Sequence, residues 1–153
     1  MSKQNGGCLC VDLIYKVTGN PGIWCRMPLS ILSTSNGSAF GTLTYFKDEN
    51  VKITARKVKE YAFTSESGTQ WKTFFFYTCA TTVFIKREVR AGLTGVTAGT
   101  LDPPKFWFDS DKEAVMRSKA SFVGDIVVKD THDTPTYYAP KRLMNPNAEK
   151  VVR

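Results

Sequence analysis

The residues of this chain that could carry chemistry are few: one histidine, four cysteines and scattered carboxylates. His132 stands in the stretch KDTHDTP, between Asp130 and Asp133, where a general base is conceivable. A catalytic triad needs groups held by a rigid scaffold, and prolines follow this stretch, so the sequence favours a solvated loop histidine. The chain contains no H-E-x-x-H, G-x-S-x-G or Walker motif and no obvious pair of carboxylates with separate acid and base roles. We therefore expect no catalytic residue and no enzyme activity.

The cysteines offer a second possible chemistry, metal binding. Cys8 and Cys10 form a C-x-C pair rather than the C-x2-C of a zinc knuckle, and His132 is distant in sequence. We therefore expect no metal ion and no cofactor, with acylation of either cysteine left open. The first residues, MSKQNGG, lack an apolar signal region, so we expect reduced thiols and a protein that is not secreted. Cys25 and Cys79 are expected to be buried and inert.

Positive charge is the clearest chemical pattern. The chain of 153 residues has 21 Lys and Arg against 14 Asp and Glu, a formal net charge of +7. Such an excess favours polyanionic partners, although a solvated basic surface would give the same numbers. The charge is concentrated in two segments, because no acid lies within 52–59 and only Glu88 lies within 86–90. The polyanion-binding residues that we expect are Lys52, Arg56, Lys57, Lys59, Lys86, Arg87 and Arg90.

The pattern of apolar residues predicts the elements that must position these groups. It indicates a mainly β protein, with a single sandwich- or barrel-like antiparallel domain over 1–128 that carries one or two short helices. An extended or mobile tail is expected over 129–153. The predicted strands are 8–18, 23–27, 42–46, 51–63 with a bulge near 57, 71–89 as two strands or one bent strand, and 121–128.

Two further segments have their own predictions. The Gly- and Pro-rich stretch 91–105 is expected to be a flexible or tightly turning connection. Ser110 and Glu113 form a capping-box pattern, which predicts a helix over 111–119. No apolar stretch reaches the roughly 20 residues that a membrane-spanning helix needs.

The opening VDLIYKVTGNPGIWCRMPLSIL, residues 11–32, consists of an amphipathic strand, a Gly/Pro turn and a second strand with an apolar end. It resembles the opening of small matrix proteins of nonsegmented negative-strand RNA viruses, such as those of bornaviruses and rhabdoviruses. The resemblance implies a non-enzymatic structural protein that self-assembles and bridges ribonucleoprotein to an anionic membrane surface. It places the protein in the virion or in the host cytoplasm, peripheral at the membrane. The Pro-rich strings DPPKFW and TPTYYAP depart from the budding motifs of such proteins.

Two alternatives stay open at this point. One is a small viral coat protein that encloses nucleic acid, although only Lys3 precedes Lys16 where an Arg-rich arm would stand. The other is a β-barrel that binds single-stranded nucleic acid and stacks bases on its tryptophans. For all three we expect a homo-oligomer, because a small β domain offers strand edges for pairing. Nucleic acid or nucleoprotein is the expected partner, with no small-molecule substrate.

Overall fold

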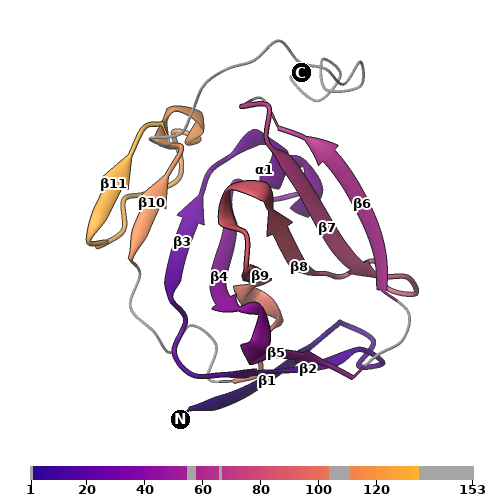
Figure 1. The fold of residues 1–153 in the computed structure, drawn as a ribbon. Coiled ribbons are helices and arrows are strands. Elements are labelled where there is room, and N and C mark those ends of the chain that lie inside the picture. Colours follow the sequence, from indigo (N-terminus) through magenta and orange to yellow (C-terminus); the bar gives the residue numbers. More distant parts are fainter. Residues whose placement is uncertain (1, 55–57, 66, 104–110, 135–153) are drawn as a thin grey trace.

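The computed structural model describes residues 2–54, 58–65, 67–103 and 111–134, which form two packed β-sheets (Figure 1). The smaller sheet is antiparallel, has the strand order β1-β2-β5, and lies below the larger one in Figure 1. Its strands are β1 (Lys3–Gly7), β2 (Ile14–Thr18) and β5 (Val51–Ile53).

The larger sheet has eight strands in the order β11-β10-β3-β4-β9-β8-β7-β6 and ends in two edges, so it does not close into a barrel. All of its pairs are antiparallel except those that join β3, β10 and β11, which are parallel. The strands are β3 (Ile23–Met27), β4 (Gly41–Lys47), β6 (Val58–Thr64), β7 (Gln70–Phe76), β8 (Thr82–Arg87), β9 (Leu93–Thr97), β10 (Lys112–Ala114) and β11 (Asp130–His132).

Short helical segments connect these strands. The α-helix α1 (Ser30–Asn36) follows β3 and ends at Gly37, whose left-handed backbone suits glycine. The 3-10 turns are η1 (Asp48–Asn50), η2 (Glu88–Arg90), η3 (Ala98–Thr100) and η4 (Met116–Ser118). Within the described part of the chain, no helix has the length and apolar character to cross a membrane.

The hydrophobic core falls into two clusters. The first lies where the sheets meet, and there the Tyr15 and Phe84 rings pack edge to face with centroids 5.0 Å apart. The second contains Leu32 of α1, with Tyr45 and Ile85 from the larger sheet. The mainly β, sandwich-like and antiparallel-rich architecture expected from the sequence is confirmed. So are the strands at 23–27 and 42–46, the hairpin turn at 64–70, and the division of 71–89 into two strands.

Other local predictions are wrong. The expected strand over 8–18 begins only at Ile14, and residues 93–97 of the expected connection form β9. A side chain at Gly95 would approach the Tyr45 ring to 3.0 Å, so this glycine lets β9 pack closely. Residues 121–128 form turns and irregular backbone instead of a strand.

The helix expected over 111–119 is also wrong, because residues 112–114 form β10 and η4 follows. Glu113, expected to complete a capping box, is buried and paired with Arg26 of β3. Ser110, the expected cap, lies outside the described residues. The division into a domain over 1–128 and a tail stays a proposal, since residues 135–153 also lie outside them.

Candidate functional site

Three cysteines that are distant in sequence meet at the junction of the two sheets. Cys8 and Cys10 lie between β1 and β2, Cys79 lies in the β7–β8 turn, and the three Sγ atoms are within 4.8 Å of one another. The Sγ atoms of Cys8 and Cys10 are 3.4 Å apart. The Leu9 backbone N–H donates to the Thr81 hydroxyl at 3.1 Å, which holds the two loops together. We call Cys8, Cys10 and Cys79 the thiol cluster.

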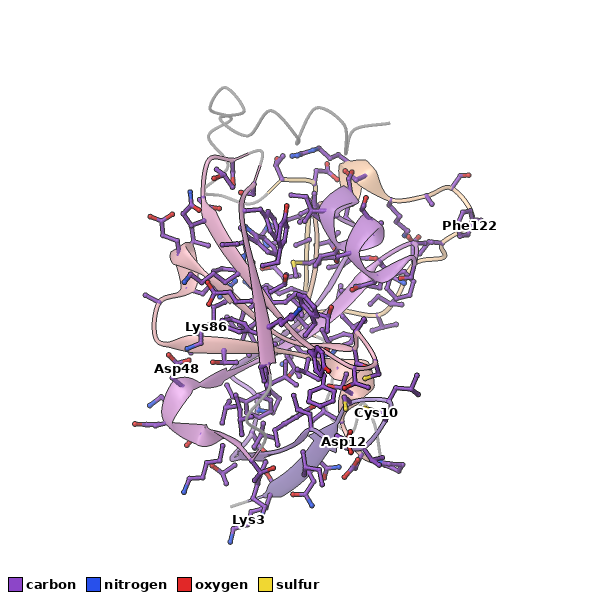
Figure 2. All side chains as sticks on the ribbon, turned by 90° about the vertical axis from the view of Figure 1, so that its right-hand side faces the viewer. Lys3, Cys10, Asp12, Asp48, Lys86 and Phe122 are labelled. Atoms are coloured by element: carbon purple, nitrogen blue, oxygen red, sulfur yellow. The ribbon has the colours of Figure 1, made fainter. Side chains whose placement is uncertain are left out.

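The thiol cluster has the donor chemistry of a zinc site. In a tetrahedral site with Zn–S bonds of about 2.3 Å, sulfurs lie about 3.8 Å apart, so the cluster needs little rearrangement to bind. The Leu13 backbone N–H lies 3.4 Å from Cys8 Sγ, a hydrogen bond that would orient a thiolate ligand. Asp12 offers a carboxylate beside the cluster, with Oδ2 3.9 Å from Cys10 Sγ (Figure 2). Three thiols with this carboxylate or water would complete four-fold coordination.

The thiols of the cluster differ in acidity. A hydrogen bond with the Thr81 hydroxyl lowers the pKa of Cys79 to about 6. A backbone hydrogen bond at Asp12 lowers the pKa of Cys10, but burial and the neighbouring thiols outweigh it and raise that pKa to about 11. Metal ligation requires thiolates, so binding at this cluster would release protons.

The loops that carry the cluster are strained. Val11 has a φ of 60° and Ala80 a φ of 56°, in the left-handed region that favours glycine. A β-branched residue is rare there, and such conformations persist where the surrounding structure enforces them. Cys79 is half-buried, so the prediction that it is buried is wrong, whereas the burial predicted for Cys25 is confirmed.

A cavity of about 180 Å³ lies against the second core cluster, around Cys25. Its walls come from β3, α1, the β6–β7 turn, β7, β8, η2, β10, η4 and β11. The ionisable side chains among its described lining comprise four cations, one carboxylate, one histidine and one thiol. These are Arg87, Arg90, Lys112, Arg117, Asp130, His132 and Cys25. The cavity therefore favours a small anionic ligand.

Aromatic rings hold two of these cations in place. The Arg87 guanidinium lies 4.3 Å from the Trp71 ring centroid and donates to the Tyr45 hydroxyl at 3.3 Å. The Arg90 guanidinium lies 4.9 Å from the Tyr45 ring centroid. The Arg90 Nε is buried and has no hydrogen-bond partner within the described residues. Buried donors are normally satisfied, so this atom has hydrogen-bonding capacity to offer a ligand.

The Cys25 thiol at the cavity is not a ready nucleophile. Burial raises its pKa to about 11, although Arg87, Arg90 and Lys112 oppose this shift. The protonated thiol therefore dominates at neutral pH, and a thiol is a far weaker nucleophile than a thiolate.

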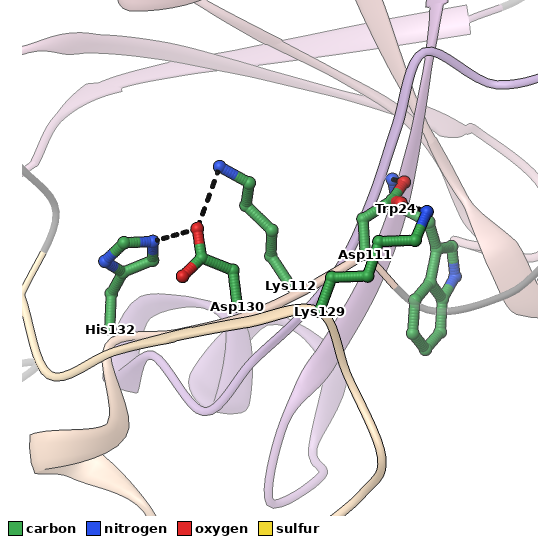
Figure 3. Close-up of polar contacts among 6 residues, drawn as sticks. All are labelled: Trp24, Asp111, Lys112, Lys129, Asp130 and His132. Atoms are coloured by element: carbon green, nitrogen blue, oxygen red, sulfur yellow. Dashed lines mark hydrogen bonds and ion pairs between the residues drawn. The ribbon is translucent and has the colours of Figure 1, made fainter.

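Strand register lines up the remaining polar groups at the cavity rim. Lys112 of β10 lies opposite Cys25 of β3 on one side and Asp130 of β11 on the other. The Asp130 carboxylate lies 3.0 Å from His132 Nε2 and 3.6 Å from Lys112 Nζ (Figure 3). The hydrogen bond with His132, with a smaller contribution from Lys112, lowers the pKa of Asp130. His132 is thus a strand residue at a cavity, and the expected loop position is wrong.

The residues predicted to bind a polyanion do not share one described surface. Lys86 is exposed and pairs with Asp48 at 3.2 Å (Figure 2), whereas Arg87, the next residue, is buried at the cavity. Polyanion binding by this set stays a prediction. Lys52 and Lys59 are exposed on β5 and β6, Arg90 lines the cavity beside Arg87, and Arg56 and Lys57 lie outside the described residues.

Comparison with known proteins identifies a family. Residues 3–118 match the family model described as GFA, glutathione-dependent formaldehyde-activating enzyme. The crystal structure of a Rhodobacter sphaeroides protein aligns with a TM-score of 0.53 at 17% identity, over 65% of this chain and 88% of that one. At that identity, the likeness shows the fold. No curated protein matches the sequence.

The family match overturns the functional expectations. The match is to a family of enzymes, so the expected role as a viral matrix protein is wrong. The coat-protein and strand-binding alternatives and the expected virion location are wrong for the same reason. The expectation of no enzyme activity is wrong for the same reason. The expected partners, namely a second copy, nucleoprotein and an anionic membrane without any small-molecule substrate, are contradicted by a family name that specifies small molecules. The opening 11–32 lies inside the matched region, and its strand–turn–strand pattern is common to many β folds.

Proposed function

Because the chain belongs to the family of glutathione-dependent formaldehyde-activating enzymes, we propose that it binds a small anionic thiol and joins it to an aldehyde in the cavity around Cys25. The observation that carries this proposal is the set of four cations, against one carboxylate, in the cavity lining. Glutathione, which the family name specifies, has two carboxylates and one thiol. Guanidinium and ammonium groups bind carboxylates through charge-assisted hydrogen bonds.

Different residues of the cavity lining would bind different parts of such a thiol. Arg90 offers its buried Nε to a carboxylate, and Arg87 adds charge from the same wall. Trp71 and Met27 give the cavity apolar surface for the carbon skeleton of the ligand. Since Cys25 is held protonated, the reacting sulfur is that of the ligand.

We assign the thiol cluster a separate role as a Zn²⁺ site. A metal held by Cys8, Cys10 and Cys79 would link the β1–β2 connection to the β7–β8 turn, as structural zinc sites do. The groove beside the cluster contains no Lys or Arg among its described lining residues. An anionic thiol therefore fits the cavity around Cys25 better than this groove.

Calorimetry with glutathione tests the proposal. Arg90→Gln should weaken glutathione binding by about 10-fold to 100-fold, the loss of one charged hydrogen bond worth about 1.5–3 kcal/mol. Lys86→Gln is the matched control, because Lys86 is an exposed cation of β8 that pairs with Asp48 and is not among the described lining residues of the cavity. 2-Mercaptoethanol, which lacks carboxylates, should bind far more weakly to the wild type and equally to both variants.

Turnover is measured by exchange NMR with ¹³C-formaldehyde, which reports formation of the S-hydroxymethyl adduct of glutathione. The wild type should raise the exchange rate above that of the free reactants, and Arg90→Gln should lower that gain at subsaturating glutathione. Absence of glutathione binding, or equal binding by Arg90→Gln and Lys86→Gln, would refute the assignment of the cavity.

A further inference from the structure

Strand β11 brings to the cavity a part of the chain that the family match does not include. The match ends at residue 118, whereas β11 comprises residues 130–132. Its parallel pairing with β10 sets Asp130 opposite Lys112 and His132 opposite Ala114, and all four residues line the cavity. The cavity therefore has a wall whose chemistry the family match cannot assign.

We infer that His132, positioned by Asp130, is the acid–base residue for the thiol bound in the cavity, an inference that rests on the proposed function. The Asp130 carboxylate accepts a hydrogen bond from His132 Nε2 at 3.0 Å (Figure 3). A carboxylate at one ring nitrogen favours the proton there and leaves the lone pair on the other. The Nδ1 atom of His132 can then accept a proton from a bound thiol.

The other ionisable groups that line the cavity with His132 are poor bases. Asp130 is a carboxylate that accepts the hydrogen bond from His132 and pairs with Lys112, and Cys25 is protonated. Arg87, Arg90 and Arg117 are cations with no lone pair to offer. His132 is thus the one imidazole among the described ionisable groups of the lining, and it is the group suited to accept and return the proton.

The proposed step balances without any further reactant. The thiol proton passes to His132 Nδ1, and the sulfur forms a bond to the aldehyde carbon. The C=O π electron pair moves to the aldehyde oxygen, and the imidazolium then returns the proton to that oxygen. The product is the S-hydroxymethyl adduct RS–CH₂–OH, a hemithioacetal, and the step involves no net oxidation or reduction.

The experiment uses the fact that His132 is the only histidine in the chain, so its imidazole NMR signals need no assignment. Addition of glutathione to the wild type should shift these signals. His132→Gln should bind glutathione within about 3-fold of the wild type but lose about 10²–10⁴ in the adduct-forming rate, the usual contribution of general acid–base catalysis.

The variant Asp130→Asn tests whether Asp130 acts by positioning the His132 ring or only by stabilising the fold. Loss of the carboxylate removes the hydrogen bond that fixes the imidazole tautomer and ring orientation, so kcat for adduct formation should fall while the KM for glutathione stays within about 3-fold of the wild type. Asp133→Asn is the matched control, because Asp133 is an exposed neighbour that is not among the described lining residues of the cavity, and it should leave both constants unchanged.

The outcomes distinguish the two proposals. If glutathione binds and the wild type is active, but His132→Gln keeps the wild-type rate and the imidazole signals do not move, the inference is overturned and the proposed function stands. If glutathione neither binds nor reacts, both are overturned. A loss of rate in His132→Gln with retained binding, together with the fall in kcat of Asp130→Asn at a nearly unchanged KM, supports both.

Discussion

The ion pair between Arg26 and Glu113 gives the sharpest test of how this fold holds its cavity. The two residues are 6% and 2% exposed and lie opposite each other on β3 and β10. Cys25 and Lys112, their immediate neighbours, form the adjacent register pair and line the cavity. We predict that Glu113→Gln destabilises the protein strongly, because it leaves a buried guanidinium without a counter-charge.

The size of this loss of stability depends on the groups that still contact Arg26 in the variant. Without the Glu113 carboxylate, Arg26 keeps a hydrogen bond to the Gly124 carbonyl at 2.9 Å and a contact with the Phe40 ring, 5.3 Å from its centroid. Breaking a buried ion pair costs about 3–5 kcal/mol. The glutamine amide still offers an acceptor, so the expected loss is about 3 kcal/mol, at the lower end of that range.

Urea unfolding followed by tryptophan fluorescence measures this loss. With a denaturant slope of about 2 kcal/mol per molar, the midpoint should fall by about 1.5 M. The control is Glu60→Gln, because Glu60 pairs with Lys72 at 2.9 Å but both side chains are about half exposed. That exposed pair should contribute less than about 1 kcal/mol. If the free energies of unfolding of Glu113→Gln and Glu60→Gln differ by less than about 1 kcal/mol, the reasoning is refuted, because the Arg26 guanidinium is then not strongly desolvated.

Two further predictions concern the thiol cluster and Asp48. Cys79→Ser should lose the single Zn²⁺ per chain and the Zn²⁺-dependent rise in melting temperature, whereas Cys25→Ser should keep both. Metal analysis measures the first property, and thermal unfolding with and without a chelator measures the second. The Thr94 hydroxyl, 2.6 Å away, and then Lys86 lower the pKa of Asp48 below the ordinary 3.8. Its contribution to stability is therefore full above pH 3.8 and is lost as the pH falls through the lower folded-state pKa. Asp48→Asn should be less stable than the wild type at pH 7, and the difference should shrink as the pH falls below 3.8, by urea unfolding over that range.

The strands of the centre of the fold could be predicted because their pattern is local. In β7, Trp71 and Thr73 are buried while Lys72 between them is exposed, the alternation that one covered face produces. Gly68, at a φ of 77°, completes the turn that the sequence TSESGTQ indicates. Such signals need no knowledge of distant residues.

The helix expected over 111–119 failed because a long-range interaction overrides a local one. Glu113 suits a capping box, but it pairs with Arg26, 87 residues away in sequence. Extended backbone sets Glu113 towards that partner and Lys112 towards the cavity, an arrangement that a strand provides and a helix does not. The sequence shows the cap pattern without the partner that outweighs it.

The cationic cavity was partly visible in the sequence. The basic pattern predicts Arg87 and Arg90 as binding residues, in one cluster along the chain with Lys86. Consecutive strand residues point to opposite faces, so Lys86 and Arg87 cannot serve the same surface. The alternation rule, applied to charge as well as to apolar residues, would have separated them. The positions of Lys112 and Arg117 in the same lining depend on the unexpected strand β10 and could not have been found this way.

The thiol cluster and the rim of the cavity share a feature that explains why neither was predicted. The described non-glycine residues with positive φ are Val11, Ala80 and Val115. Val11 and Ala80 adjoin cysteines of the thiol cluster, and Val115 lines the cavity between β10 and η4. Each adopts a conformation that its own residue type disfavours, so local preference argues against the observed backbone at both sites. Strain of this kind persists only where tertiary contacts enforce it, and it gathers at functional sites. The positions at which sequence rules fail are therefore independent support for placing metal binding at one site and catalysis at the other.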